Sequence, residues 1–207
     1  MKTNLSLAPL LVLIACSGAV AQGPIHAKTD SGKDVILNPD GTWKYSLGAP
    51  APARASTFTK PSTARKLFKP QWGNFGIWYD DTKWTISTKS TEPGRTELHL
   101  LRGQGMALVI VEEIDIPLEN LKIIALKNAK EAAPDARIVF EEPRVVNGKE
   151  VRCMKMEGTI DAIPFTYYGY YYGGTQGTIQ LLTFTGQTLF KKYEADFLEF
   201  LNGLEIY

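Results

Sequence analysis

The side chains that most often perform acid–base and metal chemistry are scarce in this sequence. Histidine is the usual acid, base and metal ligand near neutral pH, and it occurs only as His26 and His99. The two histidines show no HxH or HxxxH spacing, which argues against a zinc site. The sequence also lacks a GxSxG elbow, a phosphate-binding P-loop and a dinucleotide fingerprint. We therefore expect no metal and no cofactor, and we favour a non-catalytic protein.

Acidic residues are the remaining candidates for catalysis. Glu113 and Asp115 would share one face of a strand, but they also precede a predicted helix, whose dipole favours negative charge there. No DxDxDG loop supplies the shell of oxygens that calcium needs. A hydrolase that uses two of these carboxylates is the alternative to a non-catalytic protein. The acidic clusters are Asp80-Asp81, Glu112-Glu113 with Asp115, and Glu141-Glu142.

An aromatic run from Phe165 to Tyr172 is the unusual local composition of the chain. On a strand, alternation places Tyr168, Tyr170 and Tyr172 on one face and Phe165, Tyr167 and Tyr171 on the other. Such rings suit a core strand under helices, which is the interpretation we favour. They also suit a groove that binds a peptide, a glycan or a partner protein. For that hypothesis the ligand-binding candidates are Tyr168, Tyr170, Tyr172, Trp78 and Trp84.

The first 22 residues contain two overlapping export signals. A basic start at Lys2 leads into an apolar stretch, residues 5–15, that is too short to span a membrane and is typical of a secretory signal. Residues 13–16 resemble a bacterial lipobox, in which Cys16 would be lipidated, whereas Ala19-Val20-Ala21 is an A-x-A site for ordinary signal peptidase. We expect a signal peptide over residues 1–21, or 1–15 in a lipoprotein. The protein is then periplasmic or secreted, or else anchored to a membrane through Cys16.

The charge of the chain restricts the expected partners, and its cysteine content restricts the expected disulfides. The chain has 23 basic and 22 acidic residues, so no global electrostatic attraction to nucleic acid follows, and membrane contact is expected only if Cys16 is lipidated. Either cleavage leaves Cys153 without a partner, which excludes an intrachain disulfide. Because its setting VRCMKME is typical of a strand, we expect Cys153 to be a small buried core residue.

The pattern along the chain predicts three segments after the leader. Residues 25–46 form a small β unit with turns at residues 30–32 and 38–41. Residues 47–70 are rich in Ala, Pro, Ser and Thr without an apolar period, which predicts an extended linker. Residues 71–207 form the main domain.

In the main domain, strands are expected to outnumber helices. A helix should begin at Pro117 and end before Pro134, and a second should span residues 189–202 with Gly203 as its C-terminal cap. Asn147-Gly148 is a strong hairpin signal. This order predicts an α+β fold, an antiparallel β-sheet sandwiched by helices. The predicted strands are residues 75–79, 84–88, 97–102, 106–114, 138–146, 151–160, 165–172 and 178–185.

Two parts of the sequence resemble known groups. The stretch FGIWYDDTKWTI, the central helix and the ending TIQLLTFTGQTLFKKYEADFLEFLNGLEI resemble the PsbP-like α/β/α sandwich, including exported bacterial relatives of the DcrB type. Gly32, Val35, Leu37 and the run DGTWKY resemble a "DG..V.L..DGTW.Y" motif found near the mature start of exported bacterial proteins. The PsbP-like family has no shared catalytic motif, and its better-known members are accessory or binding proteins.

Together these observations predict an exported protein of the bacterial envelope that acts as a non-catalytic binding or accessory module. Its partner would be an envelope protein, a peptide or a glycan. The alternatives are an envelope hydrolase that uses the acidic residues, and a structural lipoprotein that tethers envelope layers through Cys16.

Overall fold

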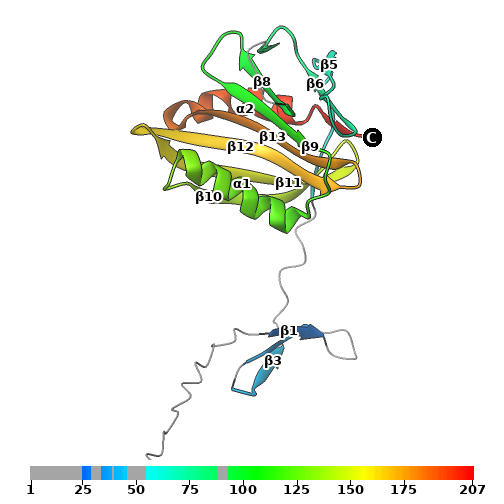
Figure 1. Ribbon diagram of the computed structural model, residues 1–207, viewed down its shortest axis with the longest axis vertical. Coiled ribbons are helices and arrows are strands. Elements are labelled where there is room, and N and C mark those ends of the chain that lie inside the picture. Colours follow the sequence, from blue (N-terminus) through cyan, green and yellow to red (C-terminus); the bar gives the residue numbers. More distant parts are fainter. Residues whose placement is uncertain (1–24, 29–33, 39, 46–54, 88–92) are drawn as a thin grey trace, which may run out of the picture. The chain divides into compact units, whose positions relative to one another are not determined.

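The computed structural model describes residues 25–28, 34–38, 40–45, 55–87 and 93–207 (Figure 1). The chain divides into two compact units, Met1–Ala53 and Arg54–Tyr207. The predicted signal peptide and Cys16 lie outside the described residues.

The first unit is the predicted β meander. Its strands β1 (Ile25–Lys28), β2 (Asp34–Leu37) and β3 (Trp43–Tyr45) pair antiparallel in chain order. In the β2–β3 turn, the Asp40 carboxylate accepts hydrogen bonds from the backbone N–H and the hydroxyl of Thr42. These bonds lower the pKa of Asp40. Aspartate and glycine at this turn therefore have a local structural role.

The second unit is built on an eight-stranded sheet in the order β4-β10-β11-β12-β13-β9-β8-β7. Neighbouring strands run antiparallel, apart from the parallel pair β4 and β10 at one edge. The β10–β11 hairpin turns at Asn147 and Gly148, both at positive φ, as the sequence predicts. The strands are β4 (Ser56–Phe58), β7 (Trp84–Ile86), β8 (Arg95–Leu100), β9 (Met106–Glu112), β10 (Arg137–Val146), β11 (Lys149–Ile160), β12 (Ile163–Gly174) and β13 (Gly177–Gly186).

A second, three-stranded sheet has the order β14-β6-β5. It contains β5 (Lys66–Phe68), β6 (Phe75–Tyr79) and a C-terminal strand β14 (Leu204–Ile206), which is not among the strands predicted from the sequence. A Cβ at Gly203 would lie 1.9 Å from the carbonyl oxygen of Trp78 on β6. Gly203 follows the last helix as expected, but it must be glycine because two backbones approach closely there.

The predicted linker over residues 47–70 needs correction. Ser56–Phe58 pairs with the end of β10, and Lys66–Phe68 pairs with β6, so the main unit begins at Arg54 and not at residue 71. Each strand has only three residues and is stabilised by backbone pairing, β4 with a strand distant in the sequence and β5 with the next strand, β6. Such short edge strands need no apolar periodicity, which is why composition alone suggested a linker.

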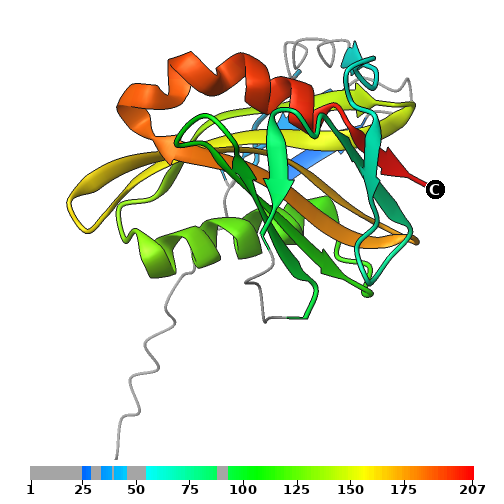
Figure 2. The ribbon, with the colours of Figure 1, turned by 90° about the horizontal axis from the view of Figure 1, so that it is seen from above.

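Two helices cover opposite faces of the large sheet (Figures 1 and 2). Helix α1 (Leu118–Ala132) packs on β11 and β12, and α2 (Phe190–Leu201), preceded by the 3-10 turn Gln187–Leu189, packs on β12 and β13. This arrangement confirms the predicted sandwich. Of the helices that the structure describes, none has the length and apolar character that a membrane crossing requires.

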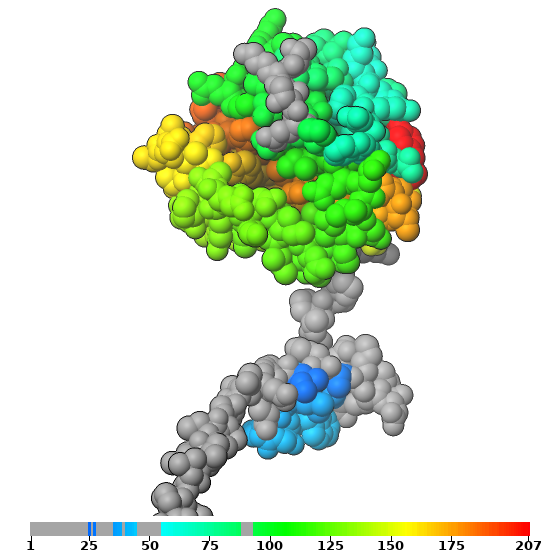
Figure 3. All heavy atoms as spheres, in the orientation of Figure 1, coloured from blue at the N-terminus to red at the C-terminus, as the bar shows by residue number. Residues whose placement is uncertain are grey.

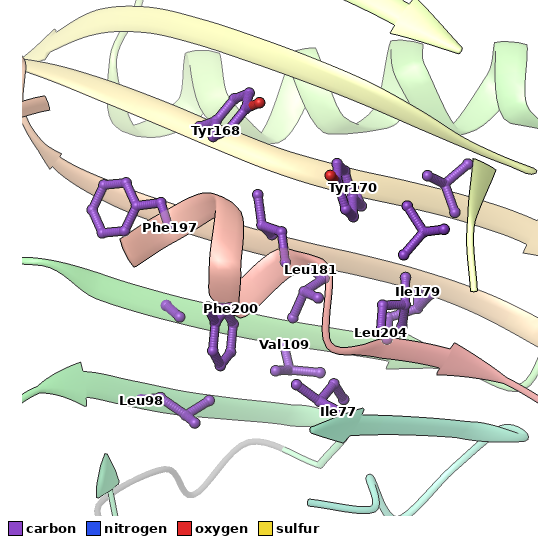
Figure 4. Close-up of a cluster of buried hydrophobic side chains, with 14 of the residues drawn as sticks. Ile77, Leu98, Val109, Tyr168, Tyr170, Ile179, Leu181, Phe197, Phe200 and Leu204 are labelled. Carbon is purple, nitrogen blue, oxygen red and sulfur yellow. The ribbon is translucent and has the colours of Figure 1, made fainter. Parts of the chain in front are cut away.

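The larger hydrophobic core lies between α2 and the sheet (Figure 4). Phe197 and Phe200 point from α2 toward Leu181 and Val109 on the central strands, and all four side chains are buried. A smaller core lies under α1, where Leu121 and Ala125 contact the opposite face. The central strands are therefore buried on both faces, as their apolar sequences predict.

Candidate functional site

Three of the five aromatic candidates lie in the core on the α2 side. Trp84, Tyr168 and Tyr170 are buried, and the Trp84 and Phe200 ring centroids are 4.6 Å apart. The hydroxyl of Tyr170 accepts a hydrogen bond from Arg144 Nη1 (3.1 Å) and donates one to Asn202 Oδ1 (2.8 Å). These contacts agree with the core interpretation of the aromatic run.

The other two candidates are half-buried and already have partners. Trp78 Nε1 donates to Glu205 Oε2 at 2.7 Å, and the Tyr172 hydroxyl bonds to Gln176 Oε1. Together the five aromatic residues line no shared pocket among the described cavities, and a ligand-binding role for them stays a prediction.

Cys153 lies in the same core as Tyr168 and Tyr170. It is a free, buried thiol, as expected, and burial raises its pKa to about 11. Near neutral pH the thiol is therefore protonated and is a poor nucleophile. Arg144, beside it, is 7% exposed, and its guanidinium pairs with Glu142 and lies 4.8 Å from the Phe58 ring centroid. This cluster joins β4, β10, β11 and β12 and is structural.

Carboxylates in two of the three acidic clusters make local hydrogen bonds or ion pairs. Asp80 accepts hydrogen bonds from the N–H and hydroxyl of Thr82, which lowers its pKa. Glu141 pairs with Lys122 and Arg152 across the α1 face. Glu113 and Asp115 are exposed beside the start of α1. Among the residues that the structure describes, no three His, Cys, Asp or Glu side chains are grouped so that they could hold a metal ion.

The most distinctive surface is the part of the α1 face that α1 leaves uncovered. Strand register places side chains of β12, β13, β9 and β8 in rows across this face. One row contains Tyr171, Gln180, Ile110 and Arg95, and a parallel row contains Tyr167, Phe184, Met106 and His99. Between them, Gly169 has no side chain, and Leu182 Cδ2 occupies this space, 2.7 Å from the position that a Cβ of residue 169 would take. Helix α1 borders these rows on one side only.

A groove runs along the border between α1 and the uncovered strands. The side chains that α1 turns toward it include Ala125, Ala129 and Ala132, whereas Leu121 fills the equivalent space near the start of the helix. Because alanine is small, a cavity of about 400 Å³ remains above Ile110, Gln180 and Leu182. Figure 3 shows the surface hollowed between α1, in yellow-green, and strands β8 and β9, in green, with the orange of β13 at the bottom. We call this cavity the α1 groove. Its volume is within the range of small-molecule sites.

Two buried polar side chains line the α1 groove. Tyr171 is 1% exposed, lines the groove, and its hydroxyl has no hydrogen-bond partner among the described residues. Gln180, its cross-strand neighbour, is 4% exposed and also lines the groove. Burial raises the pKa of Tyr171, so its hydroxyl remains a neutral donor. A buried polar group without a partner is costly, so its presence in a native protein calls for an explanation, such as a bound water or a functional role.

A second cavity of about 520 Å³ lies at the other end of the sheet, lined by His99, Met106, Phe165 and the Gly103–Gly105 turn. His99 Nε2 has no hydrogen bond among the described residues, but the His99 side chain is 43% exposed and reaches solvent. The unpaired His99 Nε2 atom is itself buried, but among the described residues no side chain that lines this cavity is both nine-tenths buried and unpaired. The α1 groove is therefore the stronger candidate site.

The α1 groove is not among the sites predicted from the sequence. The predicted candidates include the even-numbered tyrosines, which face α2, whereas the groove is lined by Tyr167 and Tyr171 from the opposite face. One sequence signal was present: alanines at positions 125, 129 and 132 on the inward side of a helix. Small residues there predict space between helix and sheet.

No protein-family model matches the chain, and a search of curated proteins finds no match. Among solved structures, the chain is similar to cyanobacterial PsbP (CyanoP) from Synechocystis sp., at 13% identity and a TM-score of 0.52, over 71% of this chain and 95% of that chain. It is also similar to the Ran-binding protein Mog1p of Saccharomyces cerevisiae, at 8% identity and a TM-score of 0.51, over 70% and 96% of the two chains. LpqN of Mycobacterium tuberculosis, which is involved in cell envelope biogenesis, matches at 11% identity and a TM-score of 0.39, over 66% and 86%.

At these identities the likeness concerns the fold and not the activity. The order of strands and the helix on each face agree with the resemblance found in the sequence, and the main unit of this chain has a PsbP-like fold.

Proposed function

We propose that this chain is an exported, non-catalytic binding module of the bacterial envelope and that its ligand occupies the α1 groove. The observation that supports a ligand is the Tyr171 hydroxyl, buried without a partner beside a cavity of about 400 Å³. Export is supported by the leader pattern in residues 1–21. The buried thiol of Cys153 and the structural pairing of Asp80, Glu141 and Glu142 favour binding over hydrolysis.

The binding proposal is tested by filling the groove. Ala129→Leu places a larger apolar side chain into the cavity, and Ala195→Leu makes the same change at an exposed site on α2. The probe is N-phenyl-1-naphthylamine, a neutral dye that fluoresces when it is buried in an apolar site. We expect saturable one-to-one binding to the wild type and to Ala195→Leu, and at least tenfold weaker binding to Ala129→Leu.

Thermal unfolding of each variant verifies that it is folded. If Ala129→Leu does not fold, Ala132→Leu at the exposed rim of the same groove replaces it. Absence of saturable binding to the wild type, or equal binding to all variants, would overturn the proposal.

Export is tested separately by intact-mass analysis of protein recovered from a bacterial periplasm and membrane fraction. A mature chain that begins at Gln22 agrees with ordinary signal-peptidase cleavage, whereas a lipidated Cys16 agrees with the tethered form. A full-length, uncleaved chain in the cytoplasm would overturn export.

A further inference from the structure

The residues of the α1 groove also restrict the chemistry of its ligand, an inference that rests on the function proposed above. Burial changes along the row Tyr171, Gln180, Ile110 and Arg95. Tyr171 and Gln180 are buried at the α1 end, whereas Ile110 and Arg95 are half-buried toward β8. A molecule that lies along this row therefore has its inner end at Tyr171 and its outer end near Arg95.

The buried part of the groove lining is polar but uncharged. Apart from the Tyr171 hydroxyl and the Gln180 amide, its buried side chains are Leu108, Ala125, Met156 and Leu182. The charged groups that line the groove, Arg95 and Glu131, belong to β8 and to the outer part of α1. The charged residue next to Tyr171 in its row, Arg152 on β11, is already paired with Glu141 and Glu119. A charged ligand group placed at Tyr171 would therefore lose its hydration without a free counterion, which is strongly unfavourable.

The same geometry disfavours a simple hydrocarbon. An alkyl chain inserted as far as Tyr171 would leave its hydroxyl without a partner and would place apolar atoms against the buried Gln180 amide. An oxygen acceptor on the ligand would instead satisfy the tyrosine, and the amide can serve as donor or acceptor. Loss of such a match is a strong source of discrimination between ligands.

We infer that the α1 groove binds a neutral, mostly apolar small molecule that presents a carbonyl or hydroxyl oxygen to the Tyr171 hydroxyl. Fatty-acid carboxylates and plain hydrocarbons are excluded as preferred ligands. The apolar body lies over Ile110 and Leu182 and under the alanines of α1.

The test uses three probes of one shape: indane, 1-indanone and indane-1-carboxylate, each measured by displacement of N-phenyl-1-naphthylamine. Wild-type protein is expected to bind 1-indanone about three- to tenfold more tightly than indane, which is the range for one neutral hydrogen bond. Indane-1-carboxylate should bind more weakly than either at neutral pH. Tyr171→Phe should bind 1-indanone and indane equally, because the donor is gone.

Tyr172→Phe is the matched control, since Tyr172 is the next residue on β12, faces the other side and bonds to Gln176. It should keep the wild-type preference for 1-indanone. If indane displaces the dye as well as 1-indanone does, or if Tyr171→Phe retains the preference, the ligand class is wrong while the binding function stands. If the dye itself does not bind, both proposals fail.

Discussion

The unpaired hydroxyl of Tyr171 leads to a prediction with an unusual sign. Most substitutions of buried residues destabilise a protein, but Tyr171→Phe removes a polar group that is 1% exposed and has no hydrogen-bond partner among the described residues. Leaving such a group unsatisfied costs about 1–3 kcal/mol, so its removal should increase the free energy of unfolding by about 1 kcal/mol. For a domain of this size, that is a rise in Tm of about 2–4 °C.

The neighbouring Tyr170→Phe is the matched control. Tyr170 is also fully buried, but its hydroxyl bonds to Arg144 and Asn202, and the substitution would leave both of these groups without that partner. We expect Tyr170→Phe to lower the free energy of unfolding by about 1–3 kcal/mol. Urea unfolding of the three proteins, followed by circular dichroism, measures both effects. A Tyr171→Phe variant that is as destabilised as Tyr170→Phe would refute the reasoning, because it would mean that the Tyr171 hydroxyl is satisfied in the free protein.

Three further predictions concern the framework of the main unit. Gly203→Ala should lower the free energy of unfolding by more than about 2 kcal/mol, because its Cβ would lie 1.9 Å from the Trp78 carbonyl oxygen. Gly186→Ala is the control: its Cβ would have no neighbour closer than 4.0 Å, so the same urea assay should show nearly unchanged stability. Equal effects would contradict the close approach. Asn147→Gly keeps the positive φ but loses three side-chain hydrogen bonds to backbone groups, so we expect the free energy of unfolding to fall by about 1–3 kcal/mol. Unchanged stability would show that the turn geometry alone matters. Cys153 should stay unreactive toward Ellman's reagent at pH 8 until the protein unfolds. Because burial raises its pKa from 9.0 to about 11, the folded state retains a proton that the unfolded state releases between pH 9 and 11. Stability therefore falls as pH rises through that window, by up to about 1.4 kcal/mol per pH unit, and Cys153→Ala should remove this part of the slope.

Elements whose signal is local could be predicted from the sequence. The Asn147-Gly148 hairpin follows from the backbone preference of two residues, and both turn residues have positive φ. Helix α2 follows from an apolar stripe that includes Phe197 and Phe200, which are both buried. In each case the residues that decide the structure are neighbours in the chain.

Elements that depend on distant pairing could not be predicted in the same way. The pattern in β6 identifies a strand, but its place in a second sheet depends on β14, more than a hundred residues later in the chain. Strand β4 pairs parallel with the end of β10, although its own sequence has no apolar alternation. Local pattern gives the type of such an element but not its neighbours.

The candidate site could not be predicted from the sequence for the same reason: it depends on elements that are distant in the chain. Strand β12 illustrates this. Tyr170 and Tyr171 are adjacent, of one residue type and both buried, and alternation correctly places them on opposite faces. Tyr170 receives its partners from positions 26 and 32 residues away, on β10 and at the end of α2. Tyr171 instead meets the alanines of α1 and a cavity. Which tyrosine belongs to the core and which to a binding site is therefore decided by the elements that pack on the strand. A sequence search for aromatic binding sites should accordingly weigh the helix opposite the strand, where alanines in place of leucines leave room for a ligand.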